Sequence, residues 1–214
     1  MGNVKTYPRT PDVNLSSHFA LHEFACKDNG VSKTVLVDDE LVQRLETLRS
    51  RLGGKAININ SGYRSPNHDK AVGGSGRGFH TKGMAADIWV QGLTCVQLGM
   101  LAKEVGFRGI GMYHRKPSEQ VVHVDTRPSP CKWLCRSGAK YNYIQNFMPM
   151  VSPTSQGDTN KTAIIMLQSC LGIAEDGKYG PATVAAVKKF QSEHGLTADG
   201  ICGVMTWKEI GKIR

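Results

Sequence analysis

Two apolar segments of the sequence each carry a histidine and an aspartate at a spacing that suits a metal site. His80 precedes Asp87 across a glycine-containing turn, and Asp87 interrupts an otherwise apolar run. A buried carboxylate is costly unless a cation or several hydrogen-bond donors face it. His123 and Asp125 alternate along a second apolar run, so their side chains share one face of a strand. Two such strands side by side predict that His80, Asp87 and His123 meet at one point.

These residue types predict zinc and a hydrolytic reaction. Two histidines and one carboxylate leave a fourth position for water, which is the pattern of catalytic rather than structural zinc. Zinc would lower the pKa of that water towards neutrality and polarise a scissile carbonyl. The same residues also allow a structural interpretation, in which the histidines are hydrogen-bonded core residues and Asp87 is paired with Arg64 or Lys82.

The elements that must position these residues follow from apolar periodicity. Leucines that recur on one face predict an amphipathic helix over residues 38–52, and residues 94–105 predict a second helix. Alternating or apolar runs predict short strands over residues 56–61, 85–90, 109–113 and 120–125. Helices followed by antiparallel-looking strands indicate the α+β class, with a small antiparallel sheet and flanking helices.

A change of composition predicts a domain boundary at residues 148–159. This stretch is rich in Pro, Ser, Thr and Gly and has no periodicity, which is typical of a linker. It divides the chain into a first domain over residues 1–147 and a second over residues 160–214. The second contains an internal repeat, because residues 176–183 resemble residues 199–206.

Each copy of the repeat begins with a DGxxG turn whose glycines permit positive φ, and each turn leads into a helix. Apolar periodicity predicts helices over residues 161–171, 181–193 and 204–211. Three short helices joined by such turns predict a compact three-helix bundle with a minimal core.

Four motifs of the first domain carry a family resemblance when they are taken in order. They are SGYRS, HxxGxAADI, GIGxY and HVDxR. Together they resemble the zinc D-Ala-D-Ala carboxypeptidases and VanY-like enzymes of the peptidase M15 family, and most closely its phage endolysin-like branch. The resemblance implies that His80, Asp87 and His123 bind Zn²⁺ and that Arg64 holds a substrate carboxylate. A guanidinium suits that role because it matches two carboxylate oxygens.

The general base is less well defined by the sequence. Many members of this family carry an acidic residue or a histidine two or three positions before the last zinc ligand, where this chain has Gln120 and Val121. Two carboxylates remain nearby. Asp125 shares the strand face of His123 and is favoured, and Glu119 is the alternative. Asp125 could instead support the histidine ligand, which would leave Glu119 as the base.

The second domain resembles the type 1 peptidoglycan-binding domain. The resemblance is carried by DGKYGPATVAAVKKFQ, GLTADGICG and the pair Thr206-Trp207. It implies that the bundle tethers the chain to peptidoglycan and raises the effective substrate concentration. Both resemblances together predict an endolysin-like zinc peptidase that cleaves the stem peptide or cross-bridge, as a D,D-carboxypeptidase or an L-Ala-D-Glu endopeptidase. The alternative is a catalytically inactive wall-binding protein on a peptidase fold.

Composition and charge indicate which classes of binding partner to expect. The net charge of +9 is compatible with polyanions, but the basic residues are scattered, which argues against nucleic acid. No apolar run approaches the roughly 18–20 residues of a membrane helix, and the first residues lack the apolar core of a signal peptide. We therefore expect a monomer made in the cytoplasm that reaches the wall after release, as phage lysins do.

The six cysteines are expected to be mostly buried thiols.

Overall fold

The computed structural model describes residues 3–114, 120–136, 141–144 and 148–212. Contacts between residues divide the chain into two compact units. The first unit contains residues 1–91, 101–110 and 122–130, and the second contains residues 92–100, 111–121 and 131–214. The domains predicted from composition, residues 1–147 and 160–214, are not defined by contacts, so their limits stay a prediction.

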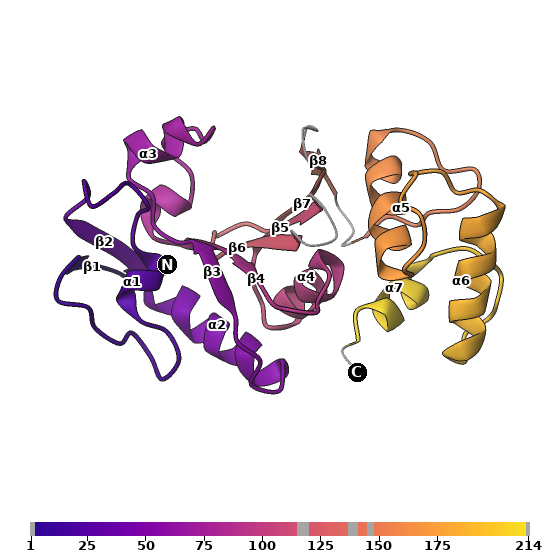
Figure 1. Ribbon diagram of the computed structural model, residues 1–214, viewed down its shortest axis with the longest axis horizontal. Coiled ribbons are helices and arrows are strands. Elements are labelled where there is room, and N and C mark those ends of the chain that lie inside the picture. The colour runs from indigo at the N-terminus through magenta and orange to yellow at the C-terminus, as the bar shows by residue number, and fades with distance from the viewer. Residues whose placement is uncertain (1–2, 115–119, 137–140, 145–147, 213–214) are drawn as a thin grey trace. The chain divides into compact units, whose positions relative to one another are not determined.

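Strands are paired in two sheets. A two-stranded antiparallel ribbon joins β1 (Val4–Pro8) to β2 (Thr34–Asp38). A second sheet has the strand order β3-β4-β6-β5-β7-β8. Its strands are β3 (Asn58–Ser61), β4 (Ala85–Trp89), β5 (Gly109–His114), β6 (Gln120–Asp125), β7 (Cys131–Arg136) and β8 (Asn142–Tyr143). The predicted α+β class is confirmed (Figure 1).

Helices accompany these strands along the chain, and the α-helices are labelled in Figure 1. They are α1 (Leu21–Phe24), α2 (Asp39–Arg51), α3 (Pro66–Ala71), the short 3-10 helix η1 (His80–Lys82), α4 (Cys95–Glu104), α5 (Asp158–Cys170), α6 (Pro181–Glu193) and α7 (Val204–Ile210).

Helix α2 buries one apolar face, as its leucine spacing predicts. Leu41, Leu45 and Leu48 are all fully buried. The helix begins after Asp38, whose carboxylate accepts a hydrogen bond from the backbone N–H of Glu40. The same carboxylate accepts a hydrogen bond of 2.5 Å from the hydroxyl of Thr126, which directly follows β6. The N-cap of α2 therefore also fixes the end of β6.

In the second unit, the two DGxxG turns are built alike around a buried glutamine. The side-chain amide of Gln168 donates to Asp176 Oδ1 at 2.7 Å and to Thr183 Oγ1 at 3.0 Å, and its oxygen accepts from the N–H of Gly177. Gln191 makes the same bonds to the aspartate and threonine that lie 8 and 15 residues later. The sequence repeat is therefore also a repeat of hydrogen bonding.

The segment predicted as a linker contributes to this second unit. Val151 is fully buried and forms an antiparallel bridge with Cys202. The carbonyl of Pro149 accepts a hydrogen bond of 2.9 Å from the indole N–H of Trp207, and α5 already begins at Asp158. The irregular backbone of this segment thus packs against α7.

No helix among the described residues is both long and apolar enough to cross a membrane. The six cysteines all lie within the described residues and form no disulfide among themselves, and Cys26, Cys95 and Cys202 are buried. Burial raises the pKa of Cys95 and that of Cys202 above the usual thiol range. These two thiols therefore stay protonated at neutral pH, which makes them poor nucleophiles.

Candidate metal centre

Three side chains of the first unit converge on one point. His80 Nε2 lies 3.2 Å from Asp87 Oδ1, His123 Nδ1 lies 3.0 Å from the same oxygen, and the two nitrogens are 3.1 Å apart. Tetrahedral zinc with bonds of about 2.0–2.2 Å separates its ligand atoms by roughly 3.4 Å. Among the described residues, this is the group of three potential ligands whose donor atoms lie close enough for one ion. The donor set and its spacing fit zinc.

Local structure explains why the three residues meet. Asp87 on β4 and His123 on β6 are direct cross-strand partners in an antiparallel pair, so their side chains stand next to each other on one face. His80 enters from η1, which ends at Gly83 with a φ of +69°. A Cβ at Gly83 would lie 2.4 Å from the carbonyl oxygen of Leu36, so this turn requires glycine.

Hydrogen bonds behind the histidines fix which nitrogen faces the common point. His80 Nδ1 lies 2.7 Å from the carbonyl oxygen of Gly62, which can only accept, so Nδ1 carries the proton. His123 Nε2 lies 3.0 Å from Asp125 Oδ2 and donates to it. His80 Nε2 and His123 Nδ1 are therefore left to bind a metal. Histidine ligands usually donate their other ring N–H to a carbonyl or carboxylate in this way.

Asp125 lies behind His123 rather than beside the common point. Its side chain is fully buried and accepts hydrogen bonds from the backbone N–H, Nε and Nη2 of Arg127. Burial alone would raise the pKa of this carboxyl, but the bonds from Arg127 and His123 outweigh it and hold the pKa well below the usual range. The geometry favours the interpretation in which Asp125 supports the histidine, over the role of general base that we favoured from the sequence.

The space for the Asp125 carboxylate depends on a glycine of the neighbouring strand. A Cβ at Gly109 would lie 2.2 Å from the carboxylate atoms. The motif GIGxY thus has a steric function, because its first glycine leaves room for the group behind His123. From the sequence, Gly109 was only part of a motif, and nothing in the sequence indicated why a glycine is needed at this position.

Arg64 contacts the other oxygen of Asp87. Its Nη2 lies 2.5 Å from Asp87 Oδ2, its Nη1 lies 3.3 Å from Asp69 Oδ1, and its Nε donates to Ser61 Oγ at 2.8 Å. The pairing of Asp87 with arginine was one of the alternatives for the sequence, and it is compatible with a metal because Oδ1 still faces the histidines. Arg64 therefore has protein partners where we expected it to await a substrate carboxylate.

The charges of the group are set by these contacts. Burial would raise the pKa of Asp87, but the two histidines hold it well below its usual range. Burial would lower the pKa of His123, but hydrogen bonds with Asp125 and Asp87 raise it to about 9. Without a metal, the raised pKa of His123 favours its protonated form, which adds a cation to Arg64 and Arg127 beside the two carboxylates.

Two residues of the site, Asp69 and Arg127, were not predicted from the sequence. Asp69 is nearly fully buried and accepts from Gly76 N at 2.8 Å as well as from Arg64. Arg127 lies over the ring of Phe79 at 4.6 Å while it bonds Asp125. The arginine of HVDxR was visible in the motif, and its spacing of two from Asp125 is the signal that could have assigned it.

Of the remaining predicted residues, Glu119 lies outside the described residues. Gln120 is engaged elsewhere, because its Oε1 accepts from Cys95 N at 3.1 Å and its Nε2 lies 2.7 Å from His114 Nδ1. At one of the two positions where the family resemblance led us to expect an acidic residue or a histidine, this chain thus has an amide that is hydrogen-bonded within the protein.

Comparison with known families agrees with the resemblance inferred from the motifs. The family Peptidase M15 matches residues 17–125, and a peptidoglycan binding domain family matches residues 161–210. The second match covers most of α5 and all of α6 and α7. Both resemblances predicted from the sequence are confirmed.

Individual relatives match shorter stretches. A zinc D-Ala-D-Ala carboxypeptidase of Streptomyces albus G is 52% identical over 42 residues, which are 20% of this chain and 16% of the relative. The peptidoglycan L,D-endopeptidase MepK of Escherichia coli K12 is 30% identical over 109 residues, 48% of this chain and 58% of the relative. An uncharacterized protein in the bpoA1 3' region of Kitasatospora aureofaciens is 43% identical over 65 residues, 29% of this chain and 55% of that protein. The chain thus spans less than two thirds of the length of these relatives.

Proposed function

Because the chain belongs to the peptidase M15 family, we propose that it is a zinc peptidase that hydrolyses a peptide bond of bacterial peptidoglycan. One observation carries the proposal. His80 Nε2, Asp87 Oδ1 and His123 Nδ1 face a common point, and each histidine donates its other N–H to a fixed acceptor. This arrangement presents three ligands and leaves a further position open, as a catalytic zinc site requires.

The chain's own residues prepare this site. When bound, zinc supplies a Lewis acid that polarises a carbonyl and lowers the pKa of a water molecule towards neutrality. Asp125 keeps His123 in the tautomer that offers Nδ1, and Arg64 orients Asp87 so that Oδ1 faces the histidines. The expected contact of Arg64 with a substrate carboxylate stays a prediction, because three protein acceptors already face its guanidinium.

We propose Glu119 as the proton acceptor of the reaction. Of the two carboxylates considered for this role, Asp125 is buried and accepts hydrogen bonds from Arg127 and His123 Nε2. A group with those partners cannot also accept a proton on the opposite side of the His123 ring. Glu119 is then the carboxylate that remains for the role.

The second part of the proposal concerns location. The peptidoglycan binding domain match over residues 161–210 supports a tethering role for α5–α7, which raises the local concentration of substrate. We propose that the chain acts on the cell wall in the manner of a phage lysin. The relatives named above include a carboxypeptidase and an endopeptidase, so both types of bond are proposed substrates.

Digestion of purified peptidoglycan tests this function. Zinc-loaded protein should release new amine termini, and mass spectrometry of the muropeptides identifies the bond. His80→Ala, Asp87→Ala and His123→Ala should each lose zinc and activity. His22→Ala is the matched control, because His22 is an exposed histidine paired with Asp12. A wild-type protein that binds zinc and peptidoglycan but releases no new termini would instead be the inactive wall-binding protein.

A further inference from the structure

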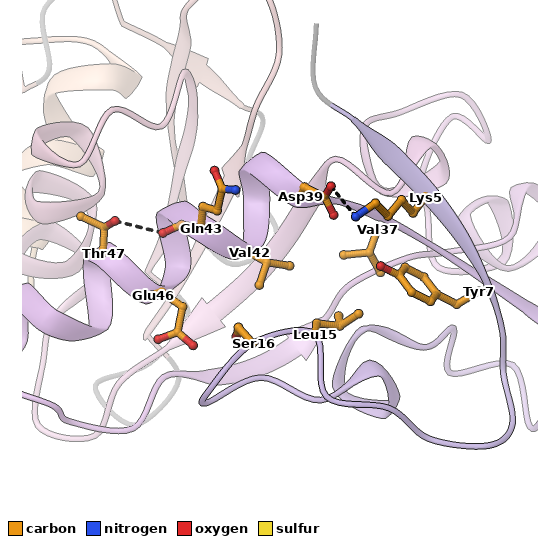
Figure 2. A pocket seen from close by; sticks show the side chains of 10 residues that line it. All are labelled: Lys5, Tyr7, Leu15, Ser16, Val37, Asp39, Val42, Gln43, Glu46 and Thr47. Atoms are coloured by element: carbon orange, nitrogen blue, oxygen red, sulfur yellow. Dashed lines mark hydrogen bonds and ion pairs between the residues drawn. The ribbon is translucent and has the colours of Figure 1, made fainter.

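The first unit contains a cavity of about 530 Å³ that none of the site residues lines. One wall is a face of helix α2. Its lining residues recur at i, i+3, i+4, i+7 and i+8, and they are Asp39, Val42, Gln43, Glu46 and Thr47. The opposite wall is β1 with Lys5 and Tyr7, and the loop residues Leu15 and Ser16 together with Val37 of β2 complete the lining (Figure 2). This volume is within the range of small-molecule sites, which is about 300–1,000 Å³.

The lining combines an apolar base with polar groups at its edge. Val37 and Val42 are buried, and the ring of Tyr7 is partly exposed. Figure 2 shows the Tyr7 hydroxyl directed across the cavity towards α2. No described residue forms a hydrogen bond with that hydroxyl or with the side-chain amide of Gln43. These two groups are therefore available to a ligand that has both an apolar face and hydroxyl or amide groups.

Charge excludes one class of ligand. Lys5 is paired with Asp39 at 2.8 Å, and Glu46 adds a second carboxylate, so the lining carries one lysine against two acidic groups. Glu46 is held by His18, whose Nδ1 lies 2.8 Å from Glu46 Oε2. An anionic polymer would meet net negative charge here. A neutral, hydroxyl-rich ligand would find acceptors in the two carboxylates and a ring face in Tyr7.

We propose that this cavity binds the glycan strand of peptidoglycan, a β-1,4-linked chain of neutral N-acetylated sugars. A pyranose ring has an apolar face for Tyr7 and the valines, and equatorial hydroxyl and acetamido groups for Gln43, Asp39 and Glu46. The proposal rests on the proposed function, because it gives the catalytic unit its own hold on the polymer whose peptides it would cleave.

A local measurement tests the site in the zinc-loaded full chain, because the C-terminal bundle would bind sugars on its own. The probe is the β-1,4-linked tetramer of N-acetylglucosamine, titrated into isotope-labelled protein and followed by NMR at the amides of Tyr7, Val37 and Gln43. Saturable shifts are expected at these amides. Tyr7→Ala and Gln43→Ala should each weaken the local affinity, by about tenfold for the aromatic ring.

Matched controls separate binding from folding. Thr6→Ala changes the neighbouring exposed residue of β1, and Ser50→Ala changes an exposed residue of α2 that does not line the cavity. Both controls should leave the local shifts unchanged. Absence of shifts at the three amides, or an equal affinity of Tyr7→Ala, Gln43→Ala and wild type, would overturn the proposal.

Hydrolysis gives a second readout that distinguishes this proposal from the peptidase itself. Tyr7→Ala should slow release of peptides from intact peptidoglycan while it leaves the rate on a sugar-free stem peptide unchanged. Equal losses on both substrates would show that Tyr7 has only a structural role and would overturn the proposal. If wild type cleaves neither substrate, the peptidase assignment fails and the NMR titration alone decides the glycan site.

Discussion

At the scale of residues, the pair His123–Asp125 joins the metal centre to the interior of the first unit. Asp125 accepts from His123 Nε2 and from Arg127, and Gly109 leaves the space that its carboxylate occupies. The carboxylate thus fixes both the tautomer and the orientation of one zinc ligand. This separates two roles, ligand support and proton transfer, that the sequence could not separate.

Substitution of this carboxylate provides the first prediction. Asp125→Asn should reduce zinc affinity by about 10–100-fold, because the bond that orients His123 is weakened. Competition with a chelator measures the affinity. Asp12→Asn is the control, since Asp12 holds an exposed histidine, His22, at 2.6 Å. Glu119→Gln should keep zinc and lose turnover. An Asp125→Asn protein with full zinc affinity and no turnover would return the role of base to Asp125.

At the scale of elements, the two turns of the C-terminal bundle depend on one glutamine each. Gln191 is buried and its side chain bonds Asp199, Thr206 and the N–H of Gly200. Loss of this side chain leaves the buried N–H of Gly200 without its partner and removes one hydrogen bond of the buried Thr206 hydroxyl. The turn is therefore stabilised by these hydrogen bonds as well as by apolar packing.

We predict that Gln191→Ala lowers the free energy of unfolding by about 2–4 kcal/mol, since each unsatisfied buried group costs about 1–3 kcal/mol. Gln168→Ala should act alike in the first turn, because the bonds are the same. Chemical denaturation measures both. Gln156→Ala, at an exposed glutamine of the same unit, is the control. Equal stability of Gln191→Ala and this control would contradict the role given to the glutamine.

Another element is held by a carboxylate with a pH-dependent contribution. Asp28 is bonded by Ser32 and Arg9 and lies near Ser65, the N-cap of α3. Burial would raise the pKa of Asp28, but the hydrogen bonds outweigh it and lower the pKa to about 2. A depressed pKa contributes stability that is complete above the unfolded value near 4 and is lost as the pH falls to about 2.

Asp28→Asn should therefore destabilise the protein at pH 7 by about 1–3 kcal/mol, as expected for lost hydrogen bonds to a charged group. The difference from wild type should shrink between about pH 4 and pH 2. Thermal unfolding of both proteins across this range measures it, and loss of zinc at low pH affects both alike. A difference that does not change with pH would show that the charge of Asp28 contributes nothing.

The elements differ in how far the sequence predicts them. The leucine spacing of α2 and the apolar runs of β4 and β6 gave bounds within one or two residues, because burial imposes a strong period. The strands β1, β2, β7 and β8 were missed, and the absence of a pattern explains the first and the last of them. Four of the five residues of β1 are exposed and β8 has two residues, so no apolar period marks them.

The site was predictable to the same limited depth. A carboxylate and a histidine inside apolar strands are conspicuous in a sequence, and these are the residues that converge. The spacing of residues in a sequence does not show which partner the second nitrogen of a histidine or the second oxygen of a carboxylate will contact. That Asp125 bonds the far nitrogen of His123, and that Arg64 turns to Asp87, depends on the packing of Gly109, Arg127 and Asp69 around them.

At the scale of the whole molecule, the two family matches indicate separable activities, hydrolysis in one part and wall binding in the other. We predict that a chelator abolishes hydrolysis and leaves binding to intact peptidoglycan unchanged, as sedimentation with purified walls measures. The fold should persist, since Asp87 and Asp125 keep Arg64 and Arg127 as partners without metal. Loss of wall binding together with zinc would show that the two activities are coupled.

The direct pairing of Asp87 with His123 also has a consequence for how the strands align. Most residues of β4 and β6 are buried on both faces, so the apolar pattern alone does little to choose between neighbouring alignments. A shift of one residue would send the carboxylate and the imidazole to opposite faces and remove the ion's binding site. Binding of the metal would therefore stabilise the one strand register in which Asp87 and His123 lie on the same face.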